Sequence, residues 1–174
     1  YKLYRIEFNE NNSIETYHPD VKVFEVFKKN TFYALLYTDF FPRPGKRNGA
    51  WMTNYLPQNQ DQRPHVSIVC NFTKPTSKKP SLLTFQEVTT LFHEFGHALH
   101  GILANTTYSS LSGTNVFWDF VEIPSQIMEN WCYEPEALNL YARHFETGEV
   151  LPIKMVEKIK KAANFQQGLQ TQRQ

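Results

Sequence analysis

The chain has 174 residues, of which 41% are hydrophobic and 20% charged, the size and composition of one globular domain. This composition excludes disordered, collagen-like and coiled-coil proteins. Eighteen basic and 17 acidic side chains leave a formal charge of +1, so neither nucleic acid nor a membrane surface is expected as a partner. The two cysteines, Cys70 and Cys132, lack metal-binding spacing and favour reduced thiols and a cytoplasmic location, with the periplasm as the alternative.

The first 75 residues are predicted to form a small β-sheet. Runs rich in Val, Phe, Tyr and Leu, bounded by turn residues, predict strands at 3–8, 21–27, 31–40, 50–56 and 65–72. Prolines and glycines at 42–49 predict a loop between the third and the fourth strand. A basic, turn-rich loop at 73–80 then ends the β-rich part.

Residues 81–174 have the apolar spacing of helices. Thr84 and Glu87 predict a capping box, and Gly101 is available near the end of the helix that follows. The apolar residues of this helix recur every three or four positions: Phe85, Val88, Phe92, Phe95, Leu99 and Ile102. A polar loop at 104–118, a second helix from 119 to about 132, and amphipathic helices at 136–145 and 152–165 should follow. The predicted fold class is α+β, with the sheet preceding a helical part.

The segment from His93 to His97 reads HEFGH, an HExxH motif inside the first predicted helix. Histidines four residues apart lie one turn apart, so both imidazoles can reach one metal ion. Glu94 points about 100° around the helix, from where a general base can reach a metal-bound water without binding the metal. Both histidines lie well away from the apolar stripe, which argues against two core histidines. The motif therefore predicts a zinc site with His93 and His97 as ligands and Glu94 as the base.

A catalytic zinc ion usually has a third protein ligand. His100 shares the face of the two histidines but lies two turns from His93, too far for all three to meet around one ion on a straight helix. It is expected beside the site. The metzincin extension would need glycine at position 100 and histidine at 103, where this chain has His100 and Leu103, and the HxxEH order is also absent.

The acids of the second helix supply the remaining candidates. Asp119 is the expected N-cap, because Asp-x-x-Glu before an apolar run is typical of a helix start. Glu122 would then lie in the first turn, where the helix dipole favours its ionised form, and an antiparallel helix would bring it near the histidines. Glu122 is therefore the predicted third ligand. Glu129, on the same face, is predicted to hydrogen-bond a ligating histidine, with an exposed helix acid as the alternative.

The same residues carry a family resemblance that extends along the whole chain. The segments concerned are His93-Glu-Phe-Gly-His-Ala-Leu-His100, Gly113-Thr114, Asp119-Phe-Val-Glu-Ile-Pro-Ser-Gln126 and Glu129-Asn-Trp131, and upstream Tyr37-Thr-Asp-Phe-Phe-Pro-Arg43, Gly45-Lys46, Val69-Cys-Asn-Phe-Thr-Lys-Pro75 and Lys79-Pro-Ser-Leu-Leu83. They strongly resemble the thimet oligopeptidase, oligopeptidase A and peptidyl-dipeptidase family of zinc metallopeptidases.

This resemblance implies hydrolysis of short peptides by one zinc ion in a zincin-type helical core beside a small sheet. It assigns zinc to His93, His97 and Glu122 and water activation to Glu94. It also implies a longer, mostly helical parent enzyme, whose further N- and C-terminal parts would be partners of these residues. The C-terminal part would supply a His and several Tyr residues that stabilise the oxyanion, so we expect the 174 residues alone to be weakly active or inactive.

Two more expectations follow from the resemblance. The strand near 66–72 is a candidate for pairing its backbone with an extended peptide substrate. Aromatic residues make up 15% of the chain, and rings that would pack against other parts of the parent enzyme should be exposed here, which favours self-association.

Two other classes of function stay open at this stage. A zinc-stabilised structural or binding module would have a closed four-ligand site, with His100 or Asp119 as the fourth ligand. A domain without any metal, carrying a chance HExxH, would bind no zinc.

Overall fold

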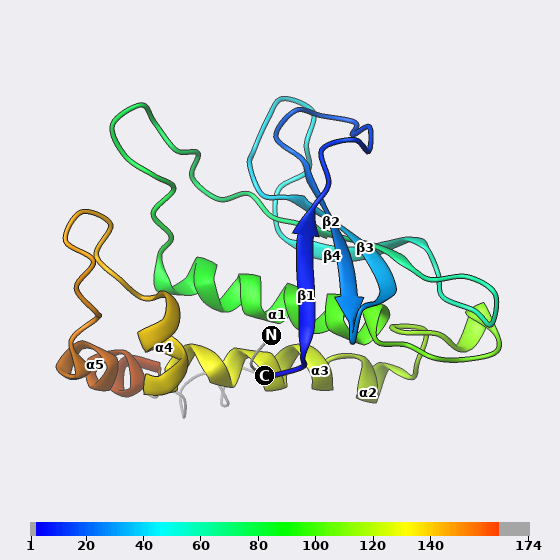
Figure 1. Ribbon diagram of the computed structural model, residues 1–174. Helices are drawn as coiled ribbons and strands as arrows, with labels where there is room; N and C mark the ends of the chain where they lie inside the picture. The colour runs from blue at the N-terminus through cyan, green and yellow to red at the C-terminus, as the bar shows by residue number, and fades with distance from the viewer. Residues whose placement is uncertain (1–2, 164–174) are drawn as a thin grey trace. The chain divides into compact units, whose positions relative to one another are not determined.

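The computed structural model describes residues 3–163 and shows an α+β fold. By its internal contacts the chain divides into two compact units, Tyr1–Met128 and Glu129–Gln174. The first unit contains a sheet, the long helix α1, the short helix α2 and all but the last residue of α3 (Figure 1). None of the helices in the described part of the chain is long and apolar enough to cross a membrane.

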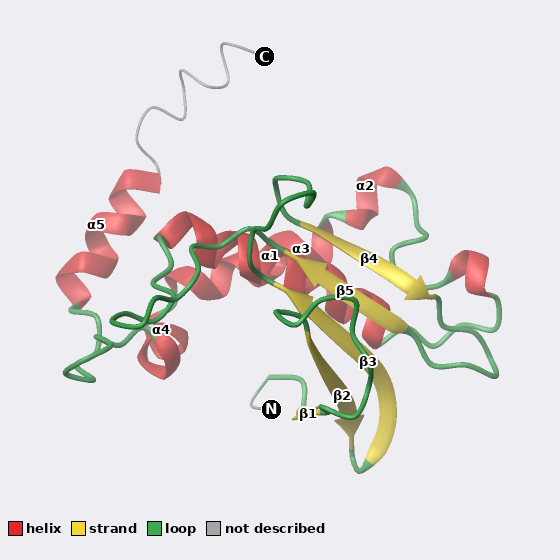
Figure 2. Ribbon diagram, turned by 90° about the horizontal axis from the view of Figure 1, so that it is seen from above, coloured by secondary structure: helices red, strands yellow, loops and turns green. Residues whose placement is uncertain are grey.

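Five strands form one mixed sheet with the order β1-β2-β3-β5-β4 (Figure 2). The strands are β1 (Ile6–Glu10), β2 (Lys22–Lys28), β3 (Thr31–Asp39), β4 (Trp51–Leu56) and β5 (His65–Val69). Strands β3 and β5 are parallel, and every other neighbouring pair is antiparallel. Strand β4 is thus an edge of the sheet, whereas β5 is paired on both sides.

The expected strands all form, with shifted ends. Strand β1 begins at Ile6 instead of residue 3, because Arg5 adopts a left-handed conformation, with φ 54°, that turns the chain. A two-residue loop, Lys29–Asn30, joins β2 to β3, and both residues have positive φ, as a tight hairpin requires. The pairing of these strands shifts between Val26 and Phe27, where β3 carries one extra residue, a β-bulge near the hairpin loop.

Helix α1 (Phe85–Ile102) lies across one face of the sheet and contacts β3, β4 and β5. Its predicted capping box forms: Thr84 Oγ1 accepts the backbone N–H of Glu87, and a Glu87 oxygen accepts the N–H of Thr84. Gly101 lies near the end of the helix, as expected, and packs against Met52 and Val66 of the sheet. The helix ends at Ile102, with Leu103 as its C-cap.

The buried face of α1 differs from the single apolar stripe that the sequence predicts. The buried residues are Glu94, Gly96, Ala98, Leu99, Gly101 and Ile102, whereas Phe85, Val88, Phe92 and Phe95 are only partly buried. Phe95 instead stacks at an angle on Phe8 of β1, with ring centroids 5.9 Å apart. The difference arises because both the sheet and a later helix cover the C-terminal half of α1, as the contacts of Gly101 and Gly96 show.

Two side chains, those of Arg63 and Gln58, hold the loop after α1 by hydrogen bonds. Arg63 donates hydrogen bonds to the carbonyl oxygens of Ile102 and Ala104, at 2.8 and 3.1 Å, and so caps the end of α1. Gln58 is buried and accepts the backbone N–H of Thr106 at 2.8 Å and the hydroxyl of Ser112 at 3.2 Å. The polar loop expected at 104–118 also contains a short 3-10 helix, η1 (Ser109–Leu111).

The second predicted helix is two helices, α2 (Trp118–Val121) and α3 (Ile123–Glu129), with a break at Glu122. The predicted N-cap is wrong: Phe117 occupies that position, and Asp119 lies inside the first turn. The side chain of Phe117 makes no capping bond, so the helix start does not follow the local signal. Helix α3 runs back alongside α1 in the opposite direction (Figure 1).

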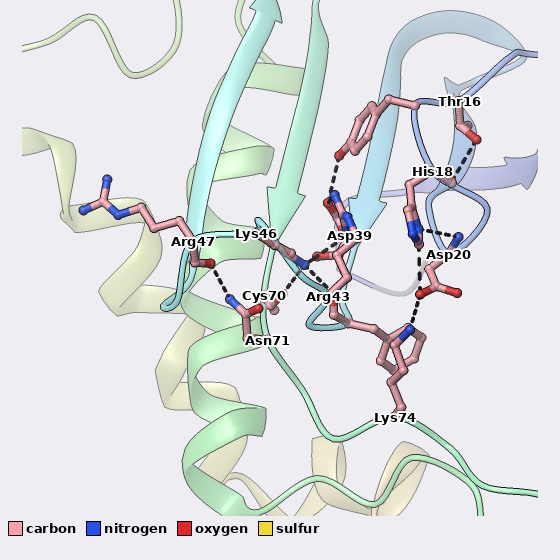
Figure 3. Close-up of polar contacts among 12 residues, drawn as sticks. Thr16, His18, Asp20, Asp39, Arg43, Lys46, Arg47, Cys70, Asn71 and Lys74 are labelled. Carbon is pink, nitrogen blue, oxygen red and sulfur yellow. Dashed lines mark hydrogen bonds and ion pairs between the residues drawn. The ribbon is translucent and has the colours of Figure 1, made fainter.

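Ion pairs of the buried Asp39 with Arg43 and Lys46 stabilise the turn after β3 (Figure 3). The carboxylate of Asp39 accepts hydrogen bonds from Arg43, at 2.7 and 2.9 Å, and from Lys46 at 2.9 Å. Tyr17 adds a hydroxyl bond at 3.0 Å. Lys46 also donates to the carbonyl oxygens of Phe41 and Cys70, so it joins the turn to the residue after β5.

The second unit is helical in its described part. A 3-10 helix, η2 (Asn130–Tyr133), leads into α4 (Pro135–Tyr141), and α5 (Ile153–Ala163) follows. Its buried apolar residues include Cys132, Leu138 and Val156. Helix α4 is shorter than expected because Arg143 instead pairs with Val150 in a β-bridge. The predicted end of the last helix, at 164–165, lies outside the described residues.

Candidate metal centre

Helix α1 presents His93 and His97 from adjacent turns. Their ring centroids are 4.8 Å apart and their planes are nearly perpendicular, at 83°. Their side chains are 27% and 12% exposed, and neither belongs to the fully buried face of the helix. Both imidazoles are thus accessible from one side of the helix while the surrounding residues restrict their movement.

Glu122 meets this histidine pair from the break between α2 and α3. Its Oε2 atom lies 3.2 Å from Nε2 of His93 and 3.1 Å from Nε2 of His97. Within the described residues these three side chains form a group whose ligand atoms all lie within 4.8 Å of one another. Two imidazole nitrogens and one carboxylate oxygen are a ligand set that zinc accepts, so the residues fit such an ion.

Ser125 orients the Glu122 carboxylate, and sequence reasoning missed it. Its hydroxyl is 2.8 Å from both the carbonyl oxygen and Oε2 of Glu122, and the residue is fully buried. A hydrogen bond that fixes a ligating side chain is usual around protein-bound metals. The sequence offers one signal for this contact, the spacing of three residues between Glu122 and Ser125. A serine hydroxyl at this spacing can reach back to the residue that precedes a helix.

Glu94 is the most deeply buried side chain of the HExxH motif, with 7% of its surface exposed. It points to the sheet side of α1, where the backbone of Met52 in β4 donates a hydrogen bond to it. Burial raises its pKa above the ordinary value, and the charge of Glu122 adds to this effect. Glu94 is not a member of the three-residue group.

Two histidines of α1 have pKa values below their ordinary value. Burial lowers the pKa of His97 and also that of His100, which keeps both imidazoles in the neutral form. A neutral imidazole is the form that binds a metal. His100 lies outside the three-residue group, and its ring contacts Phe120 of α2, with centroids 6.1 Å apart.

The remaining predicted residues do not join the group. Asp119 is exposed on α2, and Glu129 belongs by contacts to the second unit. Cys70 is buried, and burial together with the charge of Glu94 raises the pKa of its thiol to about 12, so it offers no thiolate ligand.

Comparison with known proteins identifies the family. The model of peptidase family M3 matches residues 1–174, and the chain belongs to this family. It is 46% identical over 170 residues to dipeptidyl carboxypeptidase of Escherichia coli, a match that covers 96% of this chain and 25% of that protein.

Two further relatives carry other names. Oligopeptidase A of Escherichia coli is 43% identical over 175 residues, covering 97% of this chain and 26% of that protein. Thimet-like oligopeptidase of Dictyostelium discoideum is 37% identical over 174 residues, covering 94% of this chain and 26% of that protein. The chain therefore spans about a quarter of the length of these relatives.

Proposed function

We propose that this chain carries the zinc centre and the general base of a peptidase that hydrolyses short oligopeptides. The observation that carries the proposal is the convergence of His93, His97 and Glu122, whose ligand atoms lie within 4.8 Å of one another. The names of the family and of its relatives, which are peptidases and carboxypeptidases, support the reaction class. These three residues would be the zinc ligands.

A zinc ion held there would lower the pKa of a water molecule towards ~7 and polarise the scissile carbonyl group. Glu94 would take the proton from the attacking water and pass it to the leaving amine. Its buried position raises its pKa, which favours this exchange because a base with a pKa nearer to neutrality both accepts and returns a proton readily. Its bond to Met52 holds it beside the sheet.

The substrate would be an extended peptide lying against the edge strand β4. Our expectation that the strand near 66–72 pairs with a peptide is wrong for His65–Val69. This strand, β5, is already paired with β3 on one side and with β4 on the other, so it has no free edge there. Strand β4 has one unpaired edge within the described sheet, and its Met52 contacts Glu94. A peptide added to that edge would lie close to the proposed base.

The 174 residues expressed alone should bind zinc but cleave peptides slowly. The family resemblance implies that further oxyanion donors would lie outside these residues, and one such donor is typically worth ~10²–10³ in rate.

A cytoplasmic location, with the periplasm as the alternative, goes with this proposal, because Cys70 and Cys132 are both free thiols. Glu129 stays a sequence-based prediction as a partner of a ligating histidine.

A structural zinc module is the alternative that the site geometry disfavours. Structural sites usually have four protein ligands, and the group found in residues 3–163 has three. Neither His100 nor Asp119 supplies the fourth. Three ligands leave a position open for water, as hydrolysis requires.

Replacement of Glu94 by Gln tests the proposed function. In the full-length enzyme we expect zinc content to stay at one ion and the peptidase rate to fall by ~10²–10⁴, because the amide cannot accept the proton. Metal analysis and a fluorogenic peptide assay measure the two quantities. Glu136→Gln, the same change at an exposed position of α4, should affect neither. Undiminished cleavage by Glu94→Gln would refute the role of the base.

A further inference from the structure

Helices α1 and α3 are in close backbone contact at Gly96. A Cβ atom placed on Gly96 would lie 2.5 Å from Cα of Ser125 and 2.6 Å from the carbonyl oxygen of Pro124. The carbonyl carbon of Pro124 would be 2.9 Å away. Carbon atoms in contact lie about 3.5–4.0 Å apart. Since all three neighbours are backbone atoms, they cannot rotate away, and a methyl group would force the helices apart by about 1 Å.

This contact lies between the two parts of the metal group. Gly96 separates His93 from His97 on α1, and Ser125 is hydrogen-bonded at 2.8 Å to the Glu122 carboxylate. A movement of the α3 backbone at Ser125 would therefore carry Glu122 with it. Metal–ligand distances tolerate only about 0.2 Å, so a displacement of about 1 Å would remove the carboxylate from an ion held by the two histidines.

We propose that Gly96 is a positioning residue of the zinc centre. By lacking a side chain it sets the spacing between α1 and α3 at which Glu122 reaches the ion that His93 and His97 hold. Alanine is favoured over glycine inside a helix, so helix stability gives no reason for glycine at this position. The proposal rests on the ligand set that we propose above, because a change at Gly96 would weaken zinc binding by displacing Glu122.

The second glycine of α1 provides a matched control. A Cβ atom on Gly101 would meet Oδ1 of Asn54 and Cε of Met52, both at 3.1 Å, which are far ends of side chains on the sheet side of the helix. Gly101→Ala thus makes the same chemical change in the same helix without touching α3. We expect it to keep the zinc affinity of the unchanged protein.

A double-mutant cycle in the intact protein tests the proposal. Zinc affinity is measured by chelator competition for the unchanged protein, Gly96→Ala, Glu122→Ala and the double variant. We expect Gly96→Ala to weaken zinc binding by about 10–100-fold, as loss of an orienting partner does. In the Glu122→Ala background the same change should have an effect of less than about 3-fold, because the ligand through which it acts is gone. Equal losses in both backgrounds, or unchanged affinity of Gly96→Ala, would overturn the proposal.

Glu122→Asp keeps the test decisive if Gly96→Ala fails to fold. This variant shortens the carboxylate by one carbon without any clash, and the side chain is 46% exposed. It should reproduce the loss of zinc affinity expected for Gly96→Ala. Wild-type affinity in Glu122→Asp would show that a displacement of this size is harmless and would overturn the role of Gly96. Wild-type affinity in Glu122→Ala would instead reject the ligand set itself, and with it the proposal.

Discussion

At the scale of single residues, the proposed centre depends on its ligands and also on Ser125, a residue that no sequence motif marks. His93 and His97 follow from the HExxH spacing, and Glu122 from its place after the loop. The orientation of Glu122 depends on Ser125, whose one hydroxyl proton is shared between the carbonyl oxygen and the carboxylate of Glu122. The ligands are thus fixed by neighbours as much as by their own positions.

Removal of the Ser125 hydroxyl should weaken zinc binding. We expect Ser125→Ala to raise the zinc dissociation constant by about 10-fold, because the carboxylate loses the bond that orients it. Chelator competition measures the change. Ser67→Ala is the matched control, since Ser67 is equally buried and its hydroxyl has no hydrogen-bond partner among the described residues. An unchanged constant for Ser125→Ala would show that Glu122 needs no such support.

The buried Asp39 should make stability depend on pH. Burial by itself would raise the pKa of Asp39, but hydrogen bonds from Arg43 and Lys46 outweigh this effect, so the pKa lies below its ordinary value of 3.8. A carboxylate with a lowered pKa in the folded state stabilises the protein above the unfolded-state pKa. This contribution is lost as the pH falls through the lower, folded-state value.

Asp39→Asn tests this dependence. At pH 7 we expect the free energy of unfolding to fall by about 3 kcal/mol, because the charge of Lys46 stays buried without its partner. Below about pH 4 the difference from the unchanged protein should narrow, because the unfolded state begins to bind a proton at Asp39 there, and it should narrow further as the pH falls through the lower, folded-state pKa. Urea unfolding across this pH range measures it. A difference that stays constant down to pH 2 would contradict the role of the charge.

At the scale of elements, α1 is the part of the fold whose start the local sequence determines. The capping box of Thr84 and Glu87 satisfies the first amides of the helix without help from other elements. The start of α2 has no such signal: its N-cap is Phe117, and Asp119 lies two residues further on, inside the first turn. Arg63 and Gln58 hold the first part of the loop that precedes α2.

Loss of the cap should destabilise α1 by a modest amount. We expect Thr84→Ala to lower the free energy of unfolding by about 1 kcal/mol, because the amide of Glu87 loses its acceptor. Thr84→Ser retains the hydroxyl and should stay within about 0.5 kcal/mol of the unchanged protein. Chemical unfolding followed by circular dichroism measures both. Equal losses for the two variants would mean that the methyl group, and not the cap, matters.

At the scale of the whole molecule, an apolar surface surrounds the start of α2. The exposed large apolar residues between 116 and 127 are Val116, Phe117, Trp118, Phe120, Ile123 and Ile127. Phe117 and Trp118 are 87% and 92% exposed. The expectation of exposed aromatic rings is confirmed for Phe117, Trp118 and Phe120. A surface of this kind favours association between molecules.

Polar substitution on this surface should reduce self-association. We expect the 174-residue chain to form oligomers at raised concentration, and the double variant Phe117→Ser, Trp118→Ser to shift it towards the monomer, because large apolar side chains leave the contact. Sedimentation velocity measures the distribution. Leu82→Ser, a change at a single exposed leucine in the loop before α1, should leave it unchanged. A monomeric unchanged chain would contradict the prediction.

The sequence by itself determined the elements whose signals are local. Alternating apolar runs between turn residues predicted the five strands, the capping box predicted α1, and the HExxH spacing predicted which side of that helix carries the histidines. These signals succeed because hydrogen bonds and side-chain periodicity act over a few residues. Length, composition and charge indicated the size of one globular domain.

Only the tertiary structure decided how these elements meet. It placed β5 inside the sheet and β4 at its edge, buried Glu94 against Met52, and broke the second helix at Glu122. It also brought the backbone of α3 against Gly96. Such contacts join residues far apart in the chain and depend on how packed surfaces fit, a property that no local pattern of residues records.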